Sequence, residues 1–262
     1  MQTLSATPLA QAKREAFLPN WPRRFGFLAL FLYVIYALST LQFTWERFQR
    51  GLVQGARFLD RLWPPNFAPD KLLLMSDGLL ESVQIAVLAT VVGILLSLPI
   101  GLMSARNLVP PWLSWIGRVI IAVSRSFHPM IVAILFVKAV GFGALAGILA
   151  LIVSSIGFIA KLLAEAIEEM NMKQVEAVSA TGASWLNVLI MGVVPQVMAR
   201  FVGFSAYQLD SNLRNSTMVG IVGGGGIGAT LFTAYQRFDY DFVMTILLAI
   251  IAIIMVSELF SS

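Results

Sequence analysis

Six long apolar runs constrain this sequence more than any other feature. Each holds about 20 residues, the number that a helix needs to cross the hydrocarbon core of a bilayer. Of the 262 residues, 58% are hydrophobic and 12% are charged, whereas about a quarter of a soluble domain is charged. Backbone polar groups in lipid must be satisfied within the segment itself, which favours helices. We therefore predict an all-α polytopic membrane protein with about six transmembrane helices, at residues 25–45, 82–105, 119–140, 141–160, 196–222 and 242–260.

The composition argues against several classes of function. The chain has no cysteine, which excludes a disulfide, a thiolate metal site and a cysteine nucleophile. A single histidine argues against a His-rich metal centre or a Ser-His-Asp triad. A net charge of +4 suits anionic lipid at one membrane face. With no cysteine and one histidine, we expect no metal site. Because the sequence shows no basic stripe and no RNA-binding aromatic pattern, we expect no nucleic-acid partner.

The first 81 residues precede a more regular core. Residues 1–24 are polar and basic, which favours a cytoplasmic N-terminal segment. The uncharged run 25–45 is longer than a typical signal peptide core and is predicted to be the first transmembrane helix, retained as an anchor. Residues 46–81 carry charges of both signs and form a predicted periplasmic loop. This loop either contacts an external partner or is a solvated linker with an interfacial helix. Residues 82–260 are the predicted transmembrane core.

Two basic residues interrupt the third predicted span. Arg125 and His128 lie immediately before Pro129. A cation near the centre of a bilayer costs about 2.5–3.5 kcal/mol, so both residues are candidates for lining a pathway. Two alternatives are open. For His128, the alternative is a packed histidine that is hydrogen-bonded at a proline break. For Arg125, the alternative is a position at the cytoplasmic water boundary.

The predicted span 196–222 is the most polar of the six. Asp210 and Arg214 are four residues apart on one helical face, with the acid N-terminal to the base, the better order for an ion pair. Further hydroxyl and amide groups belong to Asn212, Ser216 and Thr217. A helix of this polarity should face a cavity or other helices and not lipid.

A dense glycine run follows that span. It comprises Gly223, Gly224, Gly225 and Gly226. Glycine allows positive φ angles and close approach of other backbone segments. The run imitates a phosphate-binding P-loop, but Ala229 stands where that motif needs lysine, and no strand precedes it. We therefore reject nucleotide binding at this run.

A polar island at residues 162–195 separates two apolar segments and must lie in water. Its charged residues are Glu165, Glu168, Glu169, Lys173 and Glu176. Residues 173–181 can form a short helix, which Gly182 would end in the left-handed conformation. Ser184 is a good N-cap for a second helix over the next nine residues, and Pro195 closes that helix or opens the following one. The island is predicted to be a helix–turn–helix elbow at a membrane surface.

This elbow resembles the "EAA" loop of ABC-importer permeases. Glu176-Ala177, Gly182 six positions after the glutamate, and Pro195 match that pattern in residue type and spacing. The departures are Val178, Gly192 and Val194. The resemblance implies that Glu176, Ala177, Gly182 and Pro195 couple the chain to a separate ATPase subunit. The alternative is a plain cytoplasmic loop between two spans.

Two further segments, residues 97–110 and 211–228, resemble permeases of phosphonate-type ABC importers. Methionine-importer permeases share the glycine run and the pattern at residues 235–238. The resemblance covers roughly residues 76–260 and implies a type I ABC importer permease fold in the bacterial inner membrane. It implies a small phosphorus oxyanion as cargo (phosphonate, phosphite or hypophosphite), with methionine or another small solute as the alternative.

The resemblance also implies partners. These are a second permease subunit (a homodimer or a pseudo-dimer), two ABC ATPase subunits and a periplasmic binding protein. The chain itself would bind no cofactor, because ATP and Mg would be used by the partner ATPase. Asn212, Ser216 and Thr217 are then expected to line the pathway, with Arg214 partly neutralised by Asp210 beside gate glycines 223–226. The alternative is that the Asp210–Arg214 pair is a structural clamp at the gate.

Two other classes of function stay open. A membrane-embedded enzyme would need an arranged acid, base or metal set, and the single histidine, His128, argues against one. A stand-alone channel or secondary transporter would use Asp210 as its ion site. ATP dependence of uptake would separate both classes from an importer permease. Which oxyanion is carried is not decided by this sequence, because selectivity resides largely in the binding protein.

Overall fold

The computed structural model describes residues 21–41 and 44–261. The chain divides into two compact units, Met1–Leu59 and Asp60–Ser262. Of the predicted N-terminal segment 1–24, the first 20 residues lie outside the described residues.

The described part of the first unit is helical. Helix α1 (Trp21–Thr40) has no buried residue, and α2 (Trp45–Arg61) extends across the boundary between the units. Helix α1 confirms an apolar first span, although it begins before the predicted residue 25 and ends before 45. Helix α2 is amphipathic, with arginines along one side and Phe48, Leu52 and Leu59 along the other. The predicted loop 46–81 is therefore wrong as to secondary structure, and its alternative, an interfacial helix, fits α2 better.

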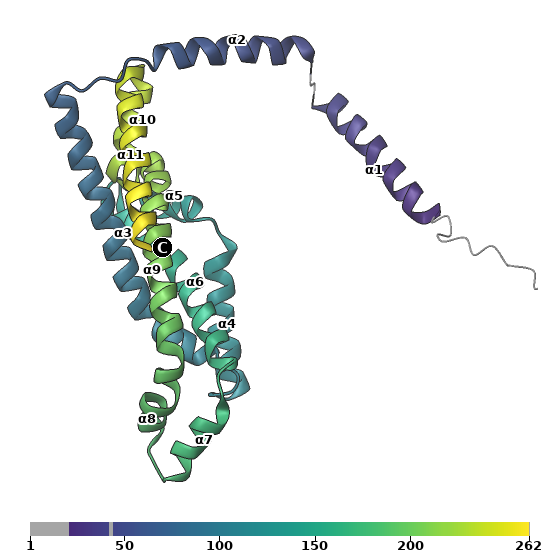
Figure 1. The fold of residues 1–262 in the computed structure, drawn as a ribbon, viewed down its shortest axis with the longest axis vertical. Helices are drawn as coiled ribbons and strands as arrows, with labels where there is room; N and C mark the ends of the chain where they lie inside the picture. The colour runs from purple at the N-terminus through teal and green to yellow at the C-terminus, as the bar shows by residue number, and fades with distance from the viewer. Residues whose placement is uncertain (1–20, 42–43, 262) are drawn as a thin grey trace, which may run out of the picture. The chain divides into compact units, whose positions relative to one another are not determined.

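The second unit is a helical bundle built around α3 (Pro69–Ser104) and α6 (Ala144–Glu168), which lie against each other over much of their length (Figure 1). Its remaining elements are α4 (Pro111–Ser126), α5 (Pro129–Val140), α7 (Met172–Ala180), α8 (Trp185–Val188), η1 (Leu189–Val193), α9 (Val194–Val219), η2 (Gly220–Gly224), α10 (Gly226–Gln236) and α11 (Tyr240–Ser261). Elements η1 and η2 are five-residue π-helical turns. Helices α7 and α8 lie at one end of the bundle and α10 lies toward the other (Figure 1).

Helix α3 begins earlier than the second predicted span. Pro69 occupies its first turn. The backbone N–H groups of a first turn have no partner within the helix, so the N–H that proline lacks costs no helical hydrogen bond there. The helix then continues through Asp77 and Glu81. Both residues were predicted to belong to the loop before the span because they are charged. Pro99 lies inside the helix, as expected, and the helix continues past it to Ser104. The helix therefore begins at Pro69, well before the predicted start of the span at residue 82.

The third predicted span is not one helix. Helices α4 and α5 meet at a 90° bend. His128 is extended, as expected for the residue directly before a proline, and Pro129 lies in the first turn of α5. The His128 Nδ1 atom accepts a hydrogen bond from the Met130 N–H at 3.3 Å, so His128 is the N-cap of α5. This confirms a histidine hydrogen-bonded at a proline break, although His128 is exposed and not packed.

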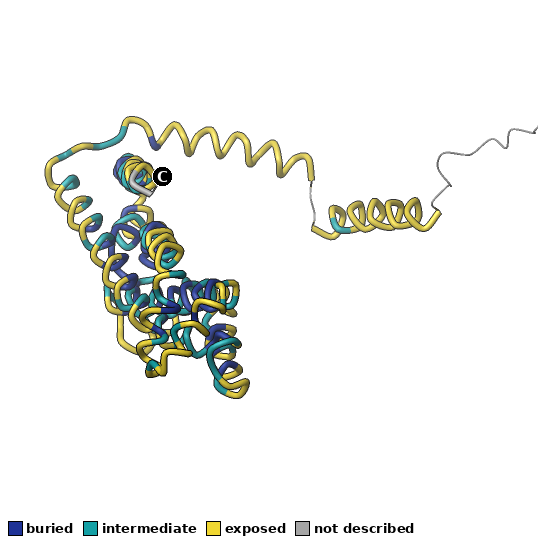
Figure 2. The backbone as a smooth tube through the Cα atoms, turned by 60° about the horizontal axis from the view of Figure 1, so that its bottom comes forward, coloured by how far each residue is buried: buried dark blue, intermediate teal, exposed yellow. Residues whose placement is uncertain are grey.

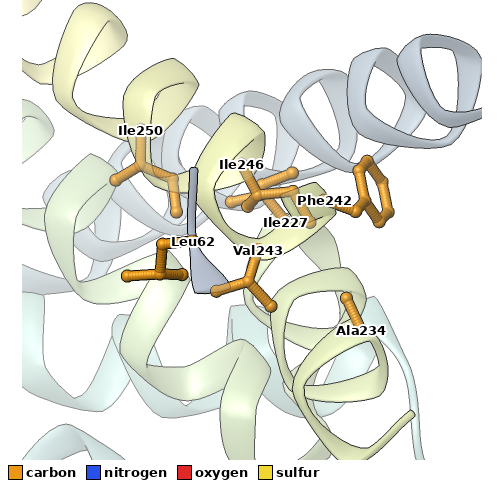
Figure 3. Close-up of a cluster of buried hydrophobic side chains, with 7 residues drawn as sticks. All are labelled: Leu62, Ile227, Ala234, Phe242, Val243, Ile246 and Ile250. Atoms are coloured by element: carbon orange, nitrogen blue, oxygen red, sulfur yellow. The ribbon is translucent and has the colours of Figure 1, made fainter. Parts of the chain in front are cut away.

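Three buried apolar clusters hold the second unit together, and the buried residues concentrate inside the bundle (Figure 2). One cluster joins Leu62 to α10 and α11 (Figure 3). A second joins α3, α5 and α6 around Leu151 and Ile85. The third joins the ends of α3 and α6 to α7, η1 and α9 around Ile167 and Val193. The third cluster fixes the elbow to the bundle.

Among the described residues, five helical segments are long and apolar enough to cross a membrane. The bent pair α4–α5 makes six if it is counted as one broken span. The prediction of an all-α membrane protein with about six spans is confirmed.

Candidate functional site

The predicted elbow is formed by α7, a turn and α8. The Asn171 side chain caps α7 by accepting the Lys173 N–H at 3.1 Å. Gly182 follows with φ of +78°, the left-handed conformation expected at a helix end. Ser184 occupies the N-cap position of α8. The predicted separate helix over 185–193 is wrong, because α8, η1 and α9 follow one another without a break and Pro195 lies in the first turn of α9.

One side of the elbow is fastened to the bundle by apolar contact. Val175 of α7 is buried and faces Gly192 of η1. A Cβ atom on Gly192 would lie 3.3 Å from the Val175 Cα atom, so a larger residue at 192 would push α7 away. Ile167, Val193 and Val197 complete the contact. Gly192, one of the departures from the EAA pattern, therefore allows α7 and η1 to pack closely.

Polar contacts fasten the same side. Asn171 donates its N–H to the Gln196 side chain at 3.1 Å, and the Gln196 amide donates to the Asn171 carbonyl at 3.4 Å. Arg200 pairs with Glu169 at 2.9 Å, and Arg118 of α4 pairs with Glu168 at 2.6 Å. These residues were not among the predicted site residues. The middle of α4, the end of α6 and the start of α9 are thus tied together at the base of the elbow.

The other side of the elbow is open. Glu176 and Ala177 are exposed, and no described residue forms an ion pair or side-chain hydrogen bond with Glu176. Trp185 and Leu186 at the start of α8 are 60% and 59% exposed. The elbow therefore combines a fixed inner side with an acidic and apolar outer side.

A substitution at Gly182 separates conformation from contact. A Cβ atom there would meet nothing within 4 Å, but the positive φ would remain. We expect Gly182→Ala to destabilise the elbow by about 1–2 kcal/mol, because L-residues pay that cost in the left-handed region. Gly203→Ala is the matched control, since Gly203 also has free space but lies inside α9 with ordinary φ. Thermal unfolding of both variants in detergent checks this, and equal losses would contradict it.

The buried face of α9 carries a hydrogen-bond network in the centre of the bundle. The Asn212 amide donates to the Thr90 hydroxyl of α3 and the Ser155 hydroxyl of α6, both at 2.9 Å. The Gln208 amide donates to Ser155 and to the Asn212 carbonyl oxygen, both at 3.0 Å. Asn212 is fully buried. The network thus fastens α9 to α3 and α6 and uses the Asn212 side chain fully.

The predicted ion pair lies on another face of α9. Asp210 and Arg214 contact each other, and the Ser257 hydroxyl of α11 donates to the second Asp210 oxygen at 2.8 Å. The Asp210 side chain is 9% exposed, whereas that of Arg214 is 45% exposed. Asp210 lies at a pocket of about 320 Å³ between α9 and α11 with otherwise mainly apolar walls. The pair therefore has a buried acidic end and an open basic end.

Ser216 and Thr217 follow on the same helix. Ser216 is buried and its hydroxyl donates to the Leu213 carbonyl at 2.8 Å. Thr217 is half-buried.

The glycine run forms η2 and the start of α10. Gly223, Gly225 and Gly226 have φ of +101°, +79° and +71°. The Gly143 N–H donates to the Gly223 carbonyl at 2.9 Å, which joins the run to the turn between α5 and α6. Gly224 lies against Gly147 of α6, where neither position has room for a side chain. The run is therefore a tightly packed reversal of the chain.

The structure does not bring all predicted residues together. No hydrogen bond or ion pair between described residues joins Arg125 or His128 to Asp210 or Arg214. Arg125 lies instead on α4 against Gly157 of α6. Within the described ranges, no group of three His, Cys, Asp or Glu residues is placed to hold a metal ion.

Residues 97–262 match the family model described as "Binding-protein-dependent transport system inner membrane component". The chain is 42% identical over 199 residues to the "Phosphate-import permease protein PhnE" of Mycolicibacterium smegmatis, covering 76% of the chain and 37% of that relative. It is 36% identical to the "Phosphite transport system permease protein PtxC" of Stutzerimonas stutzeri, covering 80% of the chain and 76% of the relative. The chain thus spans little more than a third of the mycobacterial relative and about three quarters of the second.

The fold is also similar to a solved transporter. One chain of an inward-facing structure of the MetNI methionine ABC transporter superposes with a TM-score of 0.66 and 22% identity, over 74% of this chain and 96% of that one. This likeness confirms the type I ABC importer permease fold. The match of the family model to well over half of the residues, together with these relatives, shows that the chain belongs to the inner-membrane components of binding-protein-dependent transport systems.

Proposed function

We propose that this chain is the permease subunit of an ATP-driven ABC importer for a small phosphorus oxyanion such as phosphonate, phosphite or hypophosphite. The cargo is supported by relatives whose names specify phosphate, phosphite and phosphonate transport. In this function the oxyanion is delivered by a periplasmic binding protein. Two ATPase subunits and a second permease subunit complete the importer.

The observation that carries the proposal is the two-sided elbow. Its inner side is locked to α6 and α9 through Val175, Gly192 and Gln196, so a force on α7 reaches both helices. Its outer side presents Glu176 and Trp185 for a partner. ATP supplies free energy to transport only if the ATPase binds the two permease states with different affinity. A rigidly anchored and outwardly exposed elbow would carry such a difference in affinity to α6 and α9.

The polar residues of α9 divide into two roles. Asn212 and Gln208 hold the helix in place, because their amide donors are used within the bundle. Arg214, with its exposed guanidinium partly neutralised by Asp210, is the residue available to an anion. Thr217 lies one turn further along the same helix. A partly neutralised cation suits transient contact, whereas an unpaired arginine cluster would release an oxyanion slowly.

Reconstitution tests the function. The chain is placed in proteoliposomes with its partner ATPase and binding protein, and uptake of labelled methylphosphonate is measured. We expect uptake to require both ATP and the binding protein, and to be inhibited by unlabelled phosphite and not by methionine. ATP-independent uptake would contradict the importer, and inhibition by methionine alone would replace the proposed cargo with an amino acid.

A further inference from the structure

A pocket of about 260 Å³ opens between α4 and α6, on the side of the bundle that leads to the elbow. Arg118, Arg125, Lys161 and Glu165 contribute its charged lining. Arg118 is close to the elbow because it pairs with Glu168 at the end of α6. The pocket is thus separate from the Asp210–Arg214 pair.

The charges of this pocket do not balance. Arg118 is paired with Glu168 at 2.6 Å, and Lys161 is more loosely paired with Glu165 at 3.4 Å. Arg125 has no ion pair with any described residue. Three cations therefore line the pocket with one carboxylate, Glu165, while Glu168 outside the lining pairs with Arg118. The surplus positive charge belongs to Arg125.

The aliphatic part of the Arg125 side chain packs against α6. A Cβ atom on Gly157 would lie 2.8 Å from the Arg125 Cγ atom, so only glycine lets this side chain pack so closely on α6. Arg125 also lines a second pocket of about 370 Å³, together with Ser124, His128 and Ser154. Arg125 therefore lines both pockets, whose walls are otherwise partly apolar.

An unpaired arginine in a membrane-spanning segment is costly unless water or an anion accompanies it. A guanidinium group presents a planar fork of donors that matches phosphate oxygens, and Lys161 adds a second cation within the same pocket. We propose that the α4–α6 pocket binds a phosphate-type oxyanion, with Arg125 as its free charged donor. The anion is either the headgroup phosphate of an anionic phospholipid or a free phosphorus oxyanion moving toward the elbow end. The free-anion source rests on the proposed function, whereas the lipid source does not.

The test uses the full chain in nanodiscs of phosphatidylcholine alone or with added phosphatidylglycerol. Inorganic phosphate is titrated and its ³¹P line broadening is measured, and native mass spectrometry records the lipid that stays bound. We expect Arg125→Gln to weaken phosphate binding, or the retention of phosphatidylglycerol, by about tenfold, as expected for loss of a hydrogen bond to a charged group. Phosphate binding in both disc types indicates the free anion. Retained phosphatidylglycerol that excludes phosphate indicates the lipid.

Arg237→Gln is the matched control, because Arg237 is exposed and lines a different pocket at α10. Arg125→Lys keeps the charge but loses the planar fork, so its binding should fall between those of the wild type and Arg125→Gln. Lys161→Gln provides a second test if Arg125→Gln fails to insert. Binding that is unchanged in Arg125→Gln and Lys161→Gln would overturn the site. Uptake by the wild-type importer is measured separately. If the wild-type protein binds lipid at this pocket but shows no uptake, the proposed function is contradicted and the pocket proposal is not.

Discussion

Replacing Glu176 by lysine is expected to reduce ATP-driven uptake on the order of 100-fold, the upper range of coupling between two sites. Glu176 lies on the exposed side of α7 and has no described partner in the chain, so the substitution removes no internal contact. The added charge would oppose a partner surface that accommodates an acid. Uptake of labelled methylphosphonate into proteoliposomes measures the loss, and co-purification of the ATPase measures docking.

Gln174→Lys is the matched control for this prediction. Gln174 is exposed on the same helix, two residues from Glu176. The substitution therefore adds a cation to α7 without removing the acid. We expect it to keep most of the uptake. If Glu176→Lys transports at the wild-type rate with the ATPase bound, the elbow does not transmit motion and its role as a coupling element is wrong.

The elbow could be predicted from sequence because its signals are local. A polar run, a glycine in the left-handed region at 182 and a serine at the N-cap position 184 are all signals confined to about one helical turn, although the Ser184 side chain makes no capping hydrogen bond. What stayed hidden was the continuity of α8, η1 and α9, because Gly192 and Pro195 both suggest an end to a helix. Proline is compatible with a first turn, and burial of Val193 and Val197 favours continued helix.

The limits of the spans were predicted less well, for two reasons. Asp70, Asp77 and Glu81 suggested a loop, yet charged residues are tolerated where a long helix projects from the apolar layer. The bend between α4 and α5 depends on Pro129, and a proline can either kink a helix or end it. Hydropathy alone does not distinguish these outcomes.

The buried network could not be predicted at all. Asn212 is 122 residues from Thr90 and 57 residues from Ser155 in sequence. Polarity showed that α9 avoids lipid, but only the packing of α3 and α6 shows which of its polar residues are used internally. The same holds for Ser257, whose contact with Asp210 depends on where α11 lies.

Neutralising Asp210 alone is expected to have the second large effect. Asp210→Asn leaves Arg214 without its counter-charge in a membrane-spanning helix, where a cation costs about 2.5–3.5 kcal/mol on insertion scales. We expect a lower yield of folded protein and loss of uptake. Arg214→Gln leaves the buried Asp210 carboxylate without its counter-charge, so we expect it to lower uptake and to destabilise the fold at least as much as Asp210→Asn. Thermal unfolding and uptake are measured for each variant.

The double variant Asp210→Asn with Arg214→Gln separates the two roles of the pair. If the pair is only a clamp, two amides can still hydrogen-bond at this spacing, and both folding and uptake should recover relative to Asp210→Asn. If Arg214 contacts the oxyanion, folding should recover and uptake should not. Glu46→Gln with Arg50→Gln on α2 is the control, since that pair has the same spacing but is 68–72% exposed, where ion pairs contribute little. Because Arg214 extends from a buried acid to an open surface, we expect recovery of folding without recovery of uptake. Full recovery of both would remove Arg214 from the pathway.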